Sequence, residues 1–140
     1  MKRIINYLLI SALIIACTIP AKAQELDTYS TNIGDLNAFI SSGDGYLEGS
    51  AVASFTGDGC HAIYECTLQY LASTGVWTTA SDTHVVRAYE PGRVKLITDK
   101  FYGLSIGTEY RYHVYARVVN DNGMVVDSDV ANSSSIIYRG

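Results

Sequence analysis

The sequence predicts an all-β protein, an antiparallel sandwich of about seven strands. The first observation is the alternation over residues 110–118, where Tyr, Val and Ala face one way while Arg111, His113 and Arg117 face the other. A two-residue period of this kind is typical of a strand buried on one face. The second is the Asn122–Gly123 pair that follows, a strong hairpin signal. The third is that, outside the N-terminal apolar run, no window shows the 3.6-residue apolar spacing of an amphipathic helix.

Short β segments separated by turn residues cover most of the chain. Gly-rich and Pro-containing stretches at residues 42–45, 73–75 and 90–92 mark the segment boundaries. Seven or eight such segments favour two packed sheets, because each strand has an apolar face to bury. The expected strands are 36–41, 46–55, 67–72, 76–82, 85–89, 94–102, 110–118 and 124–130, with a further extended piece at 136–138.

The N-terminus has the three parts of a cleaved secretory signal. Lys2 and Arg3 precede an almost entirely apolar stretch at residues 7–19, and Ala21 and Ala23 occupy the positions that signal peptidase recognises. We therefore expect cleavage after Ala23 and a secreted or periplasmic protein. Two alternatives stay open. The uncharged run at 4–21 is at the short limit for a membrane anchor, and residues 14–17 resemble a lipobox, which would anchor the protein by lipid through Cys17.

Cleavage would leave 117 residues, enough for one domain with a modest core. Residues 24–35 are polar at first and lack alternation, so we expect a flexible N-terminal segment before a single sandwich domain at 36–140. The mature chain has seven Lys and Arg against fourteen Asp and Glu, a net charge near −7. Because an acidic surface repels phosphate backbones and anionic lipid, we expect no nucleic-acid partner and no membrane insertion after cleavage.

Cys60 and Cys66 are the two cysteines that remain after cleavage. An even pair in an exported domain most often forms a disulfide, and the turn-rich residues 56–59 favour a loop at Cys60. The chain must then fold back, because six residues of continuous strand span about 20 Å, whereas bonded cysteines have Cα atoms about 4.4–6.8 Å apart. We expect a Cys60–Cys66 disulfide that closes a compact surface loop, a candidate contact site.

We expect no catalytic, cofactor or metal site, and therefore a protein that is not an enzyme. Cys60, His61 and Cys66 lack the second ligand pair that a zinc site needs. His84 and His113 have Ser and Thr in the same chain, but no Gly-x-Ser-x-Gly elbow or comparable signature accompanies them.

The aromatic residues are a clearer excess. Ten tyrosines remain after cleavage, more than one thin core can bury. Tyrosine is a good strand former, which explains many of them. Exposed rings on a sheet also suit packing against protein or stacking on sugars. We name Trp77, Tyr64, Tyr70 and Tyr115 as the candidate binding surface.

Residues 104–123 contain Leu-x-x-Gly-Thr-x-Tyr-x-Tyr-x-Val-x-Ala followed by Asn-x-x-Gly. This pattern resembles the late strands of a fibronectin type III or immunoglobulin-like domain. The resemblance implies that the Tyr110 hydroxyl forms a tyrosine corner with nearby backbone, and that Tyr112, Val114 and Ala116 lie in the core. The cysteine segment before Leu68, with Trp-Thr-Thr nearby, also resembles small exported bacterial β-sandwich proteins of unknown function.

The resemblance implies a binding or spacing role, since such sandwiches recur as modules with many partners. We expect a non-catalytic exported interaction module that binds another protein through one sheet face or the loop end near residues 60–66. The alternative is a carbohydrate-binding module that uses exposed aromatics. A small secreted enzyme or inhibitor is less favoured. The partner is thus an unknown protein or polysaccharide.

Overall fold

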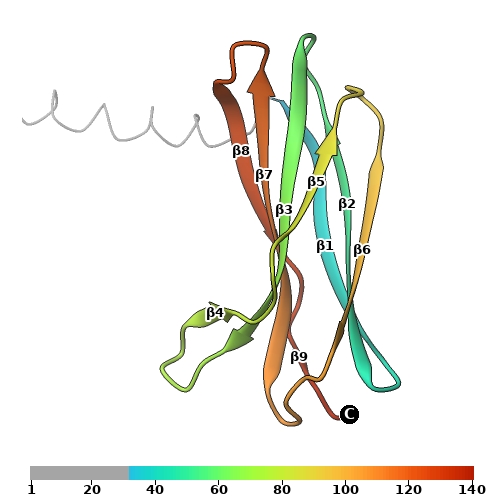
Figure 1. Cartoon of the computed structure of the whole chain (residues 1–140), viewed down its shortest axis with the longest axis vertical. Helices are drawn as coiled ribbons and strands as arrows, with labels where there is room; N and C mark the ends of the chain where they lie inside the picture. The colour runs from blue at the N-terminus through green and yellow to red at the C-terminus, as the bar shows by residue number, and fades with distance from the viewer. Residues whose placement is uncertain (1–31) are drawn as a thin grey trace, which may run out of the picture.

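The computed structural model describes residues 32–140, which form two antiparallel sheets packed face to face (Figure 1). A three-stranded sheet has the order β1 (Ile33–Gly43), β2 (Tyr46–Phe55) and β6 (Lys95–Tyr102). A larger sheet is centred on β3 (Cys60–Leu71) and β7 (Glu109–Asn120). Its remaining strands are β4 (Trp77–Thr79) and β5 (His84–Ala88), which pair with β3, and β8 (Val125–Asn132) and β9 (Ile136–Ile137), which pair with β7.

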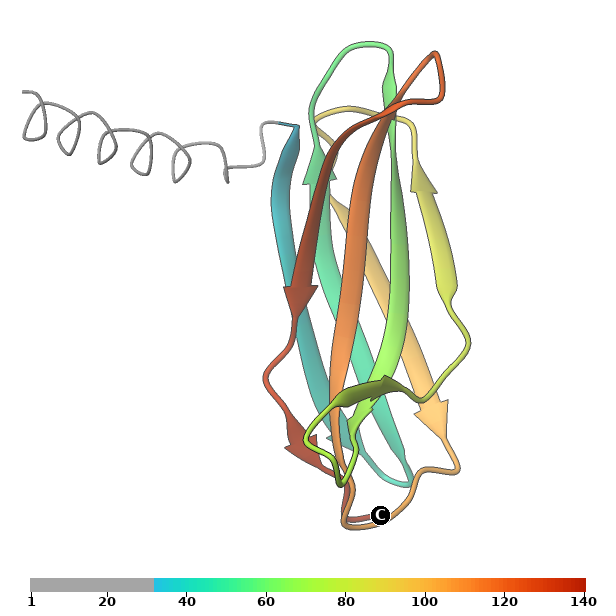
Figure 2. The same ribbon diagram turned by 90° about the vertical axis from the view of Figure 1, so that its left-hand side faces the viewer.

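The predicted all-β antiparallel sandwich is confirmed, with nine strands rather than about seven. The difference arises because each edge of the larger sheet consists of two strands. β5 pairs with the first half of β3 and β4 with its end, and β8 and β9 divide the length of β7 in the same way. Figure 2 shows β4 crossing the lower end of the molecule, apart from β5. Within residues 32–140, no helix is long and apolar enough to cross a membrane.

Inward-facing side chains from both sheets form the core. On β7, Tyr112, Val114, Ala116 and Val118 are fully buried, as the alternation predicted. They pack with inward residues of β2 and β3, and full burial of one large apolar side chain contributes about 1.5–3 kcal/mol. A second cluster fills the lower end and consists of Leu47, Leu68, Tyr110 and Tyr138.

Gly49 of β2 makes room for Tyr112. A methyl group on Gly49 would lie 2.3 Å from a ring carbon of Tyr112, which is far inside van der Waals contact. The ring therefore lies directly over the inner face of the three-stranded sheet. This close approach explains why the inward position 49 of β2 has no side chain, and the next two inward positions, Ala51 and Ala53, are also small and fully buried.

Two predicted turn features are present. The Tyr110 hydroxyl accepts a hydrogen bond from the Ser105 N–H at 3.1 Å, which is the predicted contact with nearby backbone. The hairpin at Gly123 joins β7 to β8. There Gly123 N–H donates to the Asn120 carbonyl at 2.9 Å, and Gly123 has a φ of +77°, a conformation that glycine adopts without steric cost.

Strand boundaries differ from expectation most consequentially at the starts of β1 and β3. β1 begins at Ile33, which is buried and pairs with Phe55, so residues 33–35 belong to the sandwich and not to the segment expected at 24–35. β3 begins at Cys60 and not at residue 67. Residues 24–31, the predicted signal peptide with its cleavage site, and Cys17 lie outside the described residues.

Candidate functional site

The structure contradicts the predicted Cys60–Cys66 disulfide, because both cysteines are free thiols. Residues 60–66 form the first half of the continuous strand β3 and are not a loop. Six residues of strand separate the two Cα atoms by about 20 Å, beyond the reach of a disulfide. The expected contact loop is therefore absent as well. His61 lies between two inward-facing positions and points to the opposite face, so it does not converge with the thiols.

The four aromatic residues named as a binding surface do not lie together. Tyr64 is 1% exposed and belongs to the core, and Tyr70 is half-buried against the second cluster. Trp77 and Tyr115 are half-buried. The Arg111 guanidinium covers the Trp77 ring, 4.4 Å from its centroid. The prediction of one exposed aromatic surface is wrong, because Tyr64 and Tyr70 lie on the inward face of the larger sheet and Tyr115 lies on its outward face.

A shallow polar hollow of about 290 Å³ lies beside Tyr115, over β3 and β7. Its larger polar side chains already bond within the protein, so they are not poised for a ligand. The bonded pairs are Glu65–Arg117, Gln69–Arg111 and His113–Asn132, at 2.8–2.9 Å.

The stronger candidate is the open side of the sandwich, between the edges of β5 and β6. In the part of the chain that the structure describes, β6 pairs only with β2, and β5 only with β3. On the other side of the sandwich β1 packs against β8, which closes that side. Figure 1 shows β5 and β6 running beside one another, joined at the upper end by their turn. Each strand thus has one edge without a β partner.

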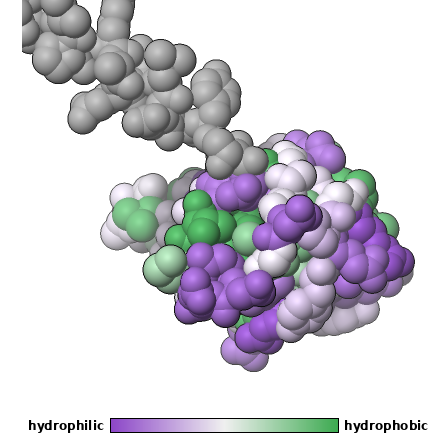
Figure 3. All heavy atoms as spheres, turned by 90° about the horizontal axis from the view of Figure 1, so that it is seen from above, coloured by the Kyte–Doolittle hydropathy of each residue, from purple (hydrophilic) through white to green (hydrophobic). Residues whose placement is uncertain are grey.

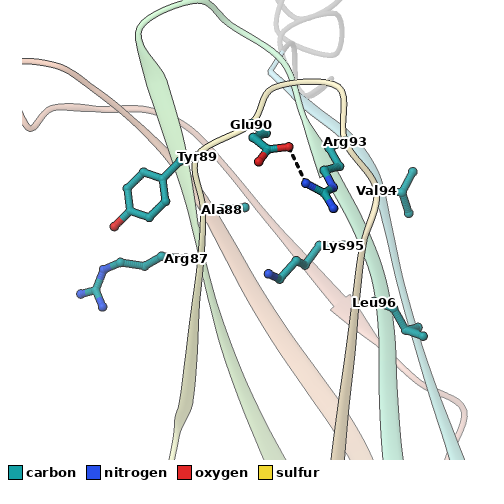
Figure 4. A pocket seen from close by; sticks show the side chains of 8 residues that line it. All are labelled: Arg87, Ala88, Tyr89, Glu90, Arg93, Val94, Lys95 and Leu96. Carbon is teal, nitrogen blue, oxygen red and sulfur yellow. Dashed lines mark hydrogen bonds and ion pairs between the residues drawn. The ribbon is translucent and has the colours of Figure 1, made fainter.

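A hollow of about 370 Å³ occupies the upper part of this open side. In Figure 4, Lys95 points from β6 towards β5, whereas Val94 and Leu96 point away from it on the far side of β6. Arg87 and Tyr89 extend from β5 in the opposite direction and form the other rim. The lining residues are Arg87, Ala88, Tyr89, Glu90, Arg93, Val94, Lys95 and Leu96.

The turn above the hollow is held by its own hydrogen bonds. Residues 90–93 form a β-turn in which the Arg93 N–H donates to the Glu90 carbonyl at 3.3 Å. Pro91 and Gly92, with φ of +78° at Gly92, are the residues that a type II turn favours. The Gly92 N–H also donates to the Phe55 carbonyl at 2.7 Å, which ties the turn to the end of β2. The rim is therefore positioned by backbone contacts.

Below the hollow, a polar network bridges the edges of β5 and β6. Asp99 of β6 accepts a hydrogen bond from the Tyr112 hydroxyl at 2.5 Å, and its other oxygen lies 2.6 Å from Nδ1 of His84 on β5. Asp99 therefore joins the two sheets across their open edges. Burial, and then the hydrogen bond to Asp99, raise the pKa of Tyr112. Burial likewise raises the pKa of Cys66, which contacts the Tyr112 hydroxyl, to about 11. Both groups keep their protons at neutral pH.

The charge of the hollow is opposite to that of the chain. Residues 32–140 include seven Lys and Arg against twelve Asp and Glu. Three of those seven basic residues line the hollow, and its one acidic residue, Glu90, is paired with Arg93 at 2.6 Å. Figure 3 views this end of the molecule and shows hydrophilic residues interspersed with smaller hydrophobic areas. The hollow is therefore a basic site on an acidic domain.

Sequence reasoning missed this site because it depends on which strand edges stay unpaired, which no local pattern specifies. One signal was present. Lys95 pairs with the fully buried Ala53, so it occupies an inward-facing position, where a lysine is unusual.

Together these features define an antiparallel β-sandwich domain with one open, basic side. No protein-family model matches the chain, and no curated protein matches its sequence.

Proposed function

We propose that this protein is a non-catalytic exported interaction module that binds another protein through its open side. The observation that carries the proposal is the pair of unpartnered strand edges, β5 and β6, with a hollow between them. Backbone N–H and C=O groups along a free edge can pair with an extended segment of a second chain. A partner strand would thereby satisfy backbone groups that otherwise bond to water.

Exposed apolar side chains beside these edges support the proposal. Tyr89, Val94 and Leu96 are 67%, 57% and 69% exposed, although all three are large hydrophobic residues. Isolated exposed hydrophobic residues are ordinary, but these three border one hollow, Val94 and Leu96 on the outer face of β6 and Tyr89 on the rim formed by β5. Their burial by a partner would supply the apolar centre that protein interfaces share.

We infer that the sandwich is of the fibronectin type III or immunoglobulin-like kind. Support comes from its strand order, with β1–β2–β6 facing a sheet centred on β3 and β7, and from the Tyr110 bond to Ser105. Sandwiches of this kind serve many unrelated roles, so the function is argued from the open side and not from the fold.

The aromatic positions favour a protein partner over a polysaccharide. Stacking on sugar rings needs a free aromatic face. Tyr64 is buried, and one face of Trp77 is covered by Arg111. Tyr115 retains an outward, half-exposed placement, so among the predicted aromatic residues it is the one whose ring is neither buried in the core nor covered by Arg111.

Site-specific photocrosslinking in the producing cell tests the proposal. A photoreactive amino acid replaces Leu96 at the open side or, as a matched control, Thr78, which is exposed on β4 at the far end. We expect a discrete protein adduct from position 96 and none from position 78. Absence of a protein adduct at 96, or the same adducts at both positions, would contradict the proposal. Retention of both variants on polysaccharide, without adducts, would favour the carbohydrate alternative.

A further inference from the structure

We propose, resting on the function above, that the partner contributes an acidic extended segment that adds as a strand to the free edge of β6. The inference joins three independent features of the open side. These are its basic charge, the direction of Lys95, and the apolar residues on the other face of the same edge.

Charge complementarity selects an acidic partner. The domain is acidic as a whole, so an acidic partner is repelled by most of its surface. The hollow is the exception, because Arg87 and Lys95 leave it a net positive charge after Glu90 and Arg93 have paired with each other. An acidic segment would therefore be steered to the open side and disfavoured elsewhere.

Lys95 makes the edge selective. Its partner in β2, Ala53, is fully buried, so Lys95 leaves β6 on the inward side, where Figure 4 shows it directed towards β5. A lysine directed inward on an edge strand opposes pairing with a neutral or basic strand, since its charge would be buried without a counter-ion. A carboxylate opposite Lys95 removes that penalty. The residue that blocks indiscriminate strand addition therefore admits an acidic strand.

The neighbouring residues specify the rest of the segment. Val94 and Leu96 flank Lys95 and project to the other face, where they are exposed. The side chains of an added strand also alternate between the two faces of the sheet. If its carboxylates face Lys95, the side chains between them lie beside Val94 and Leu96. Apolar residues suit those positions. The partner segment is thus an acidic strand with alternating acidic and apolar side chains.

Titration of the ¹⁵N-labelled mature protein with a capped peptide of alternating Val and Glu tests this inference. A Val–Lys peptide of equal length is the control. We expect saturable shifts at residues 94–98 with the acidic peptide only, weakened by added salt. The paired change Arg93→Glu with Lys95→Glu should weaken binding by about tenfold or more. Arg139→Glu, a single charge reversal at an exposed residue of the opposite end, should leave it nearly unchanged.

The wild-type titration remains decisive if the double variant fails to fold, as judged by its amide dispersion. Equal shifts with both peptides, shifts centred outside the open side, or no salt dependence would overturn the inference. If polygalacturonate shifts the same amides at equal concentration of carboxylate, the site recognises charge alone and strand addition is wrong. A protein adduct at position 96 without binding of the acidic peptide would leave the proposed function standing and reject this inference only.

Discussion

Single residues join the two sheets of this sandwich. Asp99 bonds to Tyr112 from the centre of the larger sheet and to His84 from its edge, while the Tyr112 ring packs on Gly49. A hydrogen bond to a charged group contributes about 1.5–3 kcal/mol, comparable to the burial of one large apolar side chain. Sheet-to-sheet contact therefore depends on polar geometry as well as on apolar area.

Gly49→Ala should destabilise the protein by about 1–3 kcal/mol, the usual cost of overpacking a core. The added methyl group would lie 2.3 Å from the Tyr112 ring, so the ring must move away from Asp99 or the sheets must separate. Urea unfolding measures the change. Ser50→Ala, at the next, outward-facing position of β2, is the control and should change stability by no more than about 0.5 kcal/mol. Equal midpoints for the two variants would contradict the placement of Tyr112.

Stability should fall at alkaline pH because burial raises the pKa of Cys66, Tyr64 and Tyr112. Burial raises the pKa of Cys66 from 9.0 to about 11 and that of Tyr64 from 10.0 to about 12. The unfolded chain has the ordinary values, so it loses these protons first as pH rises. The stability is fully present below pH 9 and is lost between about pH 9 and 12, by roughly 2 kcal/mol per group.

Urea midpoints between pH 8 and 11 measure this loss. Cys66→Ala should flatten the decline between pH 9 and 11. An unchanged decline in Cys66→Ala would show that Cys66 is not the titrating group.

At this scale the sequence predicted the inward face of β7 and the Tyr110 contact, because both follow from a strict local alternation. It did not predict the free thiols. An even pair of cysteines in a chain expected to be exported predicts a disulfide, but these two lie six residues apart on one continuous strand and cannot bond to each other. It also missed Asp99, whose partners come from strands remote in sequence.

At the level of elements, the hairpin between β7 and β8 depends on one backbone conformation. Gly123→Ala should destabilise the protein by about 1–2 kcal/mol, because φ of +77° is strained for a residue with a Cβ. Asn122→Ala, in the same loop at negative φ, is the matched control. Thermal or urea unfolding of the two variants measures the difference. A Gly123→Ala variant as stable as Asn122→Ala would mean that the loop adopts another geometry.

Most strand positions were predictable, since turn residues and alternation mark them locally. β3 is the exception, because the two cysteines in its first half predict a disulfide loop there. Residues 60–66 do alternate, with inward positions occupied by Cys60, Ala62, Tyr64 and Cys66. Ile63 on the other face weakens that pattern. The division of each edge of the larger sheet into two strands depends on long-range pairing and had no local signal.

At the level of the whole molecule, the proposed role requires export. We expect the mature protein to begin at Gln24, because the basic start, apolar middle and Ala-x-Ala end match a cleaved signal. N-terminal sequencing and intact mass of protein from the producing cell check this prediction. A protein that begins at Cys17 and has acyl mass would establish the lipoprotein alternative instead.

The open side is also a property of the whole molecule. Its hollow combines β5, the turn above it and β6, and its character depends on the absence of a β partner for two edges within residues 32–140. Sequence patterns specify faces of strands but not which edges meet. The candidate site could therefore be found only after the sheets were assembled.

Amide hydrogen exchange tests the central claim most directly. The partner is first identified by crosslinking, and the purified partner is then bound to the protein without a crosslink. Strand addition at the open side predicts slower exchange in residues 94–98 of the complex than in the free protein, because new backbone hydrogen bonds protect those amides. Residues 125–132, which form β8 at the closed side, should exchange equally in both states. Protection at β8 with no change in residues 94–98 would contradict the account.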